Sequence, residues 1–176
     1  MEARAPQSVP HLLETYLPRI ESFLQQLVRH AGFSLQFSVR KNETQAEDLE
    51  TPDYIVEFTG HDADLLLEKH AALLEALEYL VLKAVRLDEG SVGKISFDCR
   101  DYRRLRAEEL RLTAQVAADR VVETGEPFPL NPMTPRERRI VHLALRDRQQ
   151  VRTVSEGKGP ERRVVIHPAS TSRNQR

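Results

Sequence analysis

The 176-residue sequence contains no tryptophan, one cysteine and few aromatic residues. The single cysteine, Cys99, excludes an internal disulfide and any metal site built from several cysteines. No apolar run is long enough to cross a bilayer as a helix, and the first ten residues lack a signal-peptide pattern. These absences predict a location in the cytoplasm, and a length of 176 residues predicts one or two small domains.

Candidate catalytic groups are also scarce. The six histidines show no His-Glu-x-x-His spacing, and no cluster of carboxylates accompanies them. We therefore expect no metal, no cofactor and no catalytic residue, so the sequence does not predict an enzyme. A hydrolase or nuclease that uses His142 and His167 as an acid–base pair remains an alternative, which a nuclease assay with and without chelator would test.

Charge is divided unevenly along the chain, although the formal net charge is only −1. Residues 134–176 contain 11 Lys and Arg against 4 Asp and Glu, a net charge of +7. Residues 100–133 are balanced, and residues 1–99 therefore have a net charge of −8. A basic end on an acidic body indicates a polyanionic partner for the basic end alone, or else a solvated charged face.

Hydrophobic periodicity predicts the elements of residues 10–99. A helix over 10–31 should be divided or kinked at Pro18 and should stop near Gly32. Alternating residues predict strands at 35–39, 54–58 and 95–99, and the acidic segment 41–52 between the first two is predicted to be a loop. Between the last two strands, residues 62–70 and 71–87 predict two helices or one broken helix. The second carries an apolar stripe that we expect to face the core, formed by Leu73, Leu74, Leu77, Leu80, Val81 and Ala84.

A long helix over 103–122 follows, and the proline-rich segment 126–132 predicts an extended linker. Thr134, Pro135 and Glu137 then form a helix start signal, because threonine can cap the first turn and Glu137 can bond back to it. This helix should run to about Arg148, with one broad apolar side. The opposite side carries a basic face within a roughly 100° arc, made of Arg138, Arg139, His142 and Arg146.

Two alternating runs, 151–155 and 161–166, flank a turn of Gly157, Lys158, Gly159 and Pro160 and predict a hairpin. Together with Arg138-x-x-x-His142 on the preceding helix, this stretch resembles the Arg-x-x-x-His (R-3-H) domain of single-stranded nucleic-acid-binding proteins. The chain is similar in particular to the bacterial Jag family, also called SpoIIIJ-associated proteins or KhpB.

The order α-β-β-α-α-β over 10–99 matches the bacterial type II KH fold, and the sequence LEALEYLVLKAV resembles a helix of Jag-family KH domains. In that family a GXXG loop before this helix holds nucleotide phosphates. The matching residues here are Glu68, Lys69, His70 and Ala71. Both glycines are replaced, and Glu68 places a negative charge where a phosphate would lie. The loop is therefore degenerate, which favours a structural or pairing role over RNA binding.

The expected fold class is α+β. A KH-like domain at 10–99, with a three-stranded sheet and helices on one face, precedes a small α/β R-3-H domain at 100–168, between tails at 1–9 and 169–176. Jag-family proteins often have a further N-terminal domain, for which this sequence has no room. The resemblance implies a regulator that binds single-stranded RNA or DNA, with no membrane insertion. Phosphate contacts would come from the basic face and the hairpin, namely from Arg138, His142, Arg139, Arg146, Lys158, Arg162 and Arg163.

Because strand alternation puts Arg162 and Arg163 on opposite faces, only one of them should contact phosphate directly. An aromatic stacking platform is not expected, because Phe128 is the only aromatic residue after Tyr102. The alternative function is a protein-interaction scaffold that binds little RNA. It would pair through its KH domain with a small KH-domain protein or with itself.

Overall fold

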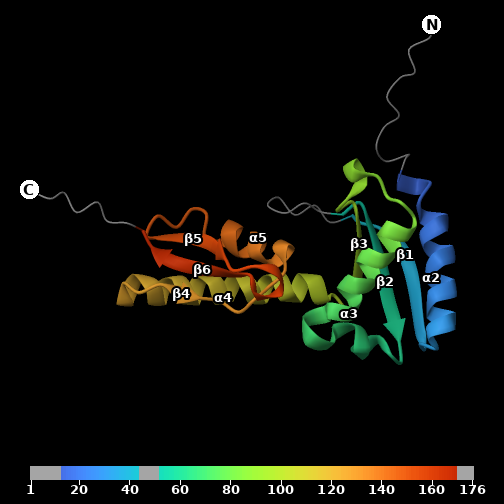
Figure 1. Cartoon of the computed structure of the whole chain (residues 1–176), viewed down its shortest axis with the longest axis horizontal. Helices are drawn as coiled ribbons and strands as arrows, with labels where there is room; N and C mark the ends of the chain where they lie inside the picture. The colour runs from blue at the N-terminus through green and yellow to red at the C-terminus, as the bar shows by residue number, and fades with distance from the viewer. Residues whose placement is uncertain (1–12, 44–51, 170–176) are drawn as a thin grey trace, which may run out of the picture. The chain divides into compact units, whose positions relative to one another are not determined.

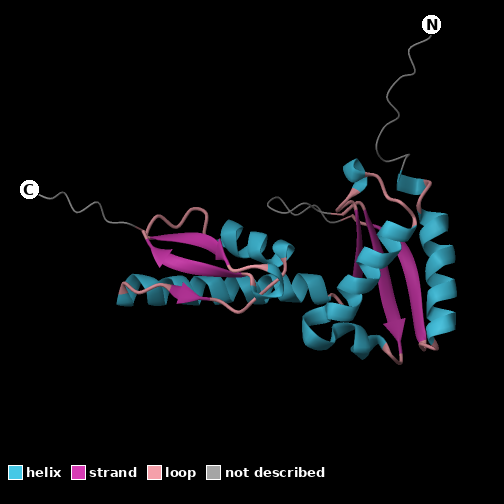
Figure 2. Ribbon diagram, viewed as in Figure 1, coloured by secondary structure: helices cyan, strands magenta, loops and turns pink. Residues whose placement is uncertain are grey.

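The computed structural model describes residues 13–43 and 52–169 (Figure 1). The chain separates into two compact units, Met1–Arg103 and Arg104–Arg176. Each unit has its own three-stranded sheet and its own helices, which Figure 2 shows in magenta and cyan. The predicted α+β class is thus confirmed, whereas the predicted domain boundary at residues 99 and 100 stays a prediction.

The first unit contains the expected order of helices and strands. It consists of α2 (Leu17–Ala31), β1 (Leu35–Lys41), β2 (Tyr54–Gly60), α3 (Ala63–Ala84), a 3-10 turn (Glu89–Ser91) and β3 (Ile95–Cys99). The predicted third strand has the bounds that were expected. The first two strands each continue two residues further than predicted, so Lys41 belongs to β1 rather than to the loop. Residues 44–51 of the predicted loop lie outside the described residues.

One face of the first sheet packs against the helices. β2 is the central strand, antiparallel to β1 and parallel to β3. Val56, Phe58 and Phe97 are fully buried and share a core with Ile20 and Leu24 of α2 and with α3. On the other face lie polar residues such as Gln36, Ser38 and Glu57. Helices on one face of a three-stranded sheet were expected for the KH-like part.

Pro18 divides the N-terminal helical segment, as predicted. Residues 13 and 14 are helical, a turn follows, and α2 begins at Leu17 with Pro18 in its first turn. Proline is tolerated there because the first N–H groups of a helix have no intrahelical partner. The helix ends at Gly32, which has φ 72° and donates its N–H to the carbonyl oxygens of Arg29 and Val28.

The segment predicted as two helices or one broken helix is α3, which is broken at Glu68–Ala71. Glu68 is extended, and Lys69, His70 and Ala71 all have φ between 50° and 60°. Three consecutive non-glycine residues in the left-handed region are strained, because each Cβ approaches a neighbouring carbonyl. The predicted apolar stripe was wrong at Leu80 and Ala84, which are exposed.

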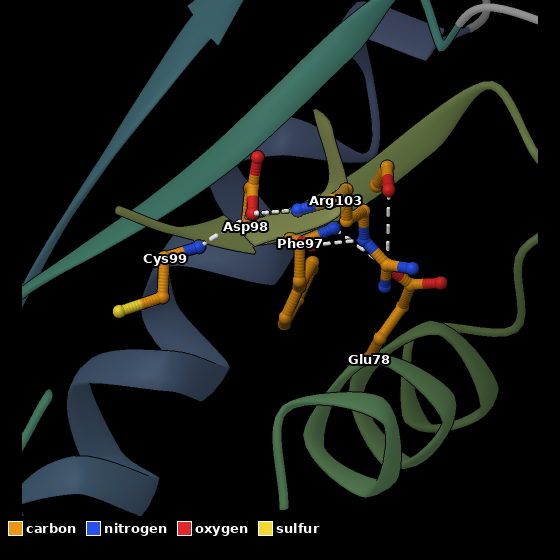
Figure 3. Close-up of polar contacts among 6 residues, drawn as sticks. Glu78, Phe97, Asp98, Cys99 and Arg103 are labelled. Carbon is orange, nitrogen blue, oxygen red and sulfur yellow. Dashed lines mark hydrogen bonds and ion pairs between the residues drawn. The ribbon is translucent and has the colours of Figure 1, made fainter. Parts of the chain in front are cut away.

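A polar cluster joins α3, β3 and the start of the next helix (Figure 3). The Glu78 carboxylate accepts the N–H of Phe97 at 2.6 Å and a guanidinium N–H of Arg103 at 2.8 Å. Arg103 also donates through Nε to the Phe97 carbonyl oxygen at 2.5 Å. Asp98 Oδ1 accepts the N–H groups of Cys99 and Arg103. Side chains therefore fix both the strand and the first turn of α4 (Tyr102–Thr124).

The second unit begins within α4, at Arg104, and continues with β4 (Phe128–Pro129), α5 (Pro135–Ala144), β5 (Val151–Glu156), a 3-10 turn (Gly159–Glu161) and β6 (Arg163–Pro168). The sheet order is β4-β6-β5, with antiparallel pairs. The predicted hairpin is confirmed, but its second strand begins at Arg163 instead of Glu161. The predicted linker was wrong at Phe128 and Pro129, which pair with β6.

Candidate nucleic-acid interface

The helix that carries the Arg-x-x-x-His pair starts as the sequence predicts. Thr134 Oγ1 accepts the N–H of Glu137 at 3.3 Å, and Glu137 Oε2 accepts the N–H of Thr134 at 2.9 Å. These reciprocal bonds satisfy two of the N–H groups left free at a helix start. Glu137 Oε1 also accepts from Arg106 Nε at 2.7 Å. The same carboxylate therefore caps α5 and fastens it to α4.

The far end of α5 differs from the prediction. The helix stops at Ala144, and tighter turn bonds follow from Arg146 N–H to Leu143 O and from Arg148 N–H to Leu145 O. Leu145 is buried, and Arg148 forms an ion pair with Asp119 of α4. These contacts turn the chain back toward β5. Arg146 therefore lies beyond the helix, is exposed, and is not part of its face as predicted.

His142 is held between two hydroxyl groups of β5. Its Nδ1 lies 2.6 Å from Thr153 Oγ1, and its Nε2 lies 3.0 Å from Ser155 Oγ. Thr153 and Ser155 are two residues apart on one strand, so they point to the same face of the sheet. The imidazole is thus fixed in position and orientation by α5 on one side and β5 on the other.

Arg138, one turn before His142, is a half-buried cation whose Nε is buried without a hydrogen-bond partner. Within residues 13–43 and 52–169, its guanidinium makes no ion pair. A buried donor without a partner is destabilising, and a charged one especially so, because its hydration has been lost. Nearly all buried polar groups in proteins have partners, so Arg138 is unusual in carrying a hydrogen-bond donor that no described residue satisfies.

The pKa of His142 lies below its ordinary value. Burial lowers the pKa first, because the charged imidazolium is poorly solvated there, and the positive charge of Arg138 lowers it further. The imidazole is therefore neutral at pH 7. In the neutral ring one nitrogen donates and the other accepts, which fits two hydroxyl partners because a hydroxyl can do either.

The other predicted site residues lie on α5 and on the hairpin. Arg139 is exposed on α5, and Lys158 is exposed in the hairpin turn. Arg162 is exposed at the end of the 3-10 turn, whereas Arg163 is partly buried at the start of β6. The structure thus places the four cations on α5 and the hairpin, and only Arg138 sits beside His142.

His167 lies away from His142. It faces Arg152 across the β5–β6 pair, and its Nε2 is 3.0 Å from the Glu156 carboxylate. Residues 152 and 156 alternate with Thr153 and Ser155, so they occupy the opposite face of the sheet. The two histidines therefore cannot act together as the acid–base pair that the sequence left open.

Thr153 and Ser155 are the site residues that sequence reasoning missed. Both lie in the alternating run that predicted the strand, and their two-residue spacing placed them on one face. The sequence offered one signal: this face of the strand carries hydroxyl residues, although a face that packs against a helix usually carries apolar residues. Hydroxyl residues are common on strands, however, and the register that brings α5 to them depends on the tertiary fold.

The residues that were predicted to match a GXXG loop occupy the break in α3. Glu68, Lys69 and His70 are exposed, whereas Ala71 is buried. The left-handed backbone that glycines would adopt easily is therefore present here in residues with side chains. Glu68 contributes a carboxylate to this exposed loop, beside the positive charge of Lys69.

Two further findings concern the described part of the chain. None of its helices has the length and apolar character needed to span a membrane. Its histidine, cysteine and carboxylate side chains nowhere form a group of three or more that could hold a metal ion.

Comparison with known proteins identifies the C-terminal part. Residues 108–168 match the R-3-H domain family. RNA-binding protein KhpB of Clostridium symbiosum is 33% identical over 153 residues, which cover 87% of this chain and 66% of that protein. RNA-binding protein KhpB of Bacillus subtilis is 34% identical over 129 residues, 72% of this chain and 61% of that protein. The corresponding protein of Lactiplantibacillus plantarum is 35% identical over 102 residues, 58% of this chain and 32% of that protein.

The chain thus spans about two thirds or less of the length of these bacterial relatives. The predicted R-3-H domain and the predicted likeness to KhpB are confirmed. The KH assignment of the first unit stays a prediction, which the order of its helices and strands supports.

Proposed function

We propose that this chain, a relative of the KhpB proteins with an R-3-H domain at residues 108–168, binds single-stranded RNA through the face formed by α5 and β5. The observation that carries the proposal is the guanidinium of Arg138, which is half-buried and has an unsatisfied Nε beside a fixed His142. A phosphate oxygen would supply both the missing hydrogen bond and the opposite charge. Single-stranded DNA offers the same phosphate chemistry.

Charge supports the assignment of binding to the second unit. Residues 134–176 carry a net charge of +7, whereas residues 1–99 carry −8. The contact would extend along the backbone of the strand to Arg139, Arg146, Lys158 and Arg162, which is more exposed than Arg163, with Arg138 and His142 at its centre. The acidic first unit, with Glu68 in its loop, would contribute little. The role is that of a non-enzymatic regulator in the cytoplasm.

The test is a binding titration of the full chain with single-stranded RNA at several salt concentrations. Contact with about three to five phosphates predicts a slope of log K against log salt near −2 to −3.5. Arg138→Gln should weaken binding by about 1–3 kcal/mol, because a charge-assisted bond is lost, and should make the slope shallower by about 0.7.

Arg152→Gln is the matched control, since Arg152 is an exposed arginine on the opposite face of β5. It should cause a clearly smaller loss than Arg138→Gln. An affinity that does not depend on salt would refute binding led by phosphate contacts. Equal losses for the two variants would mean that net charge alone attracts RNA, without a site at Arg138.

A second function, pairing with another protein, is favoured by the exposed apolar side of α3. Tyr79 is 68% exposed and Leu80 is 48% exposed, on a helix that otherwise packs into the core. The partner would be a small KH-domain protein or a second copy of the chain. Sedimentation of the chain and of Leu80→Glu would test self-pairing, and a monomer at all concentrations would exclude it.

A further inference from the structure

The hydrogen-bond capacity around His142 leaves one donor unused. A neutral imidazole has one N–H and one bare nitrogen, so it donates to one hydroxyl and accepts from the other. If Nδ1 carries the proton, the Ser155 hydroxyl donates to Nε2 and the Thr153 proton remains free. If Nε2 carries it, the Thr153 hydroxyl donates to Nδ1 and the Ser155 proton remains free. Either tautomer therefore uses one hydroxyl proton and leaves the other.

The free hydroxyl proton has no other acceptor within residues 13–43 and 52–169. Thr153 and Ser155 make no side-chain bond there apart from those to His142, and both are partly exposed. One turn before His142 lies Arg138, whose Nε also lacks a partner. Two unused donors, one neutral and one charged, thus both lie next to His142.

We infer that the hydroxyls of Thr153 and Ser155 belong to the phosphate-binding site, where one fixes His142 and the other donates its proton to a phosphate oxygen beside Arg138. This inference rests on the proposed function. In the inferred phosphate-binding site, the positive charge that neutralises the phosphate comes from Arg138 alone. His142 is a positioning residue that sets which hydroxyl proton points outward.

The surroundings of His142 support a neutral ring. Its own helix presents the positive charge of Arg138, which disfavours a second positive charge nearby. β5 presents the two hydroxyls, and the β6 residues paired with them, Ile166 and Val164, are buried and apolar. No carboxylate among the described residues contacts the ring to stabilise an imidazolium.

The experiment compares variants of the full chain in titrations with a single-stranded RNA oligonucleotide. Thr153→Val and Ser155→Ala remove the hydroxyls and keep the side chains similar in size. Each should weaken binding by about threefold to tenfold, the effect of one neutral hydrogen bond. Thr153→Ser and Ser155→Thr keep the hydroxyls and should bind like the unmodified chain. Ser38→Ala, at an exposed serine on β1, is the matched control and should have no effect.

Salt and pH separate this inference from a purely structural role. A neutral donor releases no counterion, so Thr153→Val and Ser155→Ala should keep the salt slope of the unmodified chain, whereas Arg138→Gln should not. Affinity of the unmodified chain should stay flat between pH 8 and pH 6.5. Circular dichroism melts of each variant identify the temperatures at which it is folded, and the titrations are compared there.

The outcomes are distinct. Unchanged affinity in Thr153→Val and Ser155→Ala, with loss in Arg138→Gln, would overturn this inference and leave the proposed function standing. Affinity that rises steadily from pH 8 to pH 6.5 and loses that dependence in His142→Gln would overturn it too, because the imidazolium would then bind the phosphate. Failure of the unmodified chain to bind RNA would refute the proposed function and this inference with it.

Discussion

Glu137→Gln should strongly destabilise the second unit, although glutamine has nearly the same size and shape as glutamate. The side chain of Glu137 is only 12% exposed and that of its ion-pair partner Arg106 only 14%. Removing one charge from a buried pair costs about 3–5 kcal/mol, because the other charge stays buried without compensation. A glutamine at this position can still accept the N–H of Thr134, and Arg106 keeps its ion pair with Glu109. We therefore expect the free energy of unfolding to fall by about 2–3 kcal/mol.

The chain offers a separate optical signal for each unit. Its four tyrosines, at 16, 54, 79 and 102, all lie in the first unit, and the chain has no tryptophan. Tyrosine fluorescence therefore follows the first unit, while far-ultraviolet circular dichroism follows both. Glu137→Gln should lower one circular dichroism transition by roughly 10–20 °C, at about 4–8 °C per kcal/mol for a small unit. The tyrosine transition should not move.

Acid should remove the difference between Glu137→Gln and the unmodified chain. Burial alone raises the pKa of Glu137, but the hydrogen bonds from Arg106 and Thr134 outweigh it, so the pKa lies below its ordinary value. The stabilisation is thus fully present above the ordinary carboxyl pKa of about 4.3 and is lost as pH falls through the lower pKa of the folded state. The difference in stability between the two proteins should therefore begin to shrink as the pH falls below about 4.3 and should vanish below the lowered pKa of the folded state.

Glu108→Gln is the control, because Glu108 forms an exposed ion pair with Arg104 on α4, the helix that also carries Arg106. Exposed pairs of this spacing contribute only about 0.3–0.5 kcal/mol. Equal destabilisation by the two glutamine substitutions would refute the idea that Glu137 locks α5 to α4. So would a difference between Glu137→Gln and the unmodified chain that persists unchanged at pH 3.

Three further substitutions test the first unit by its tyrosine fluorescence in urea. Lys69→Gly should stabilise it by about 0.5–1 kcal/mol, because relief of left-handed strain exceeds the entropy cost of glycine, and destabilisation would argue against the break in α3. Gly60→Ala should destabilise it by about 1–3 kcal/mol, since its Cβ would lie 2.4 Å from Ser34 O at φ 118°; an unchanged midpoint would contradict that approach. Glu78→Gln should lower the stability of the first unit by about 1–2 kcal/mol, because partly buried Arg103 loses its counter-charge, while the stability of the second unit should stay unchanged.

Local signals in the sequence predict the structure where neighbouring residues determine it. The capping box at Thr134 and Glu137 depends on residues three apart, and the alternation of Ile95, Phe97 and Cys99 is enough to define β3. The division of the first helix at Pro18 likewise follows from the ring of one residue. In each case the physical cause acts within one turn or one short strand.

Other features depend on residues far apart, which periodicity does not show. Phe128 and Pro129 are a strand only because β6 lies beside them. On α4 the buried side consists largely of alanines, whereas Leu112 and Val116 are exposed, so side-chain size misleads about the direction of the core. The partners of His142 were missed for the same reason, because Thr153 and Ser155 meet it only after α5 has packed on the sheet.

The bonds around Phe97 also determine where the first sheet can grow. Lys94 O accepts from Tyr54 N–H, so alternation directs the N–H and carbonyl of Phe97 away from β2, toward the open edge. There Glu78 and Arg103 occupy both groups. A strand from another molecule therefore finds no free backbone partner at the middle of β3. Aggregation by edge-to-edge pairing, or recruitment of an extended peptide, is left to β1 on the opposite side of the sheet.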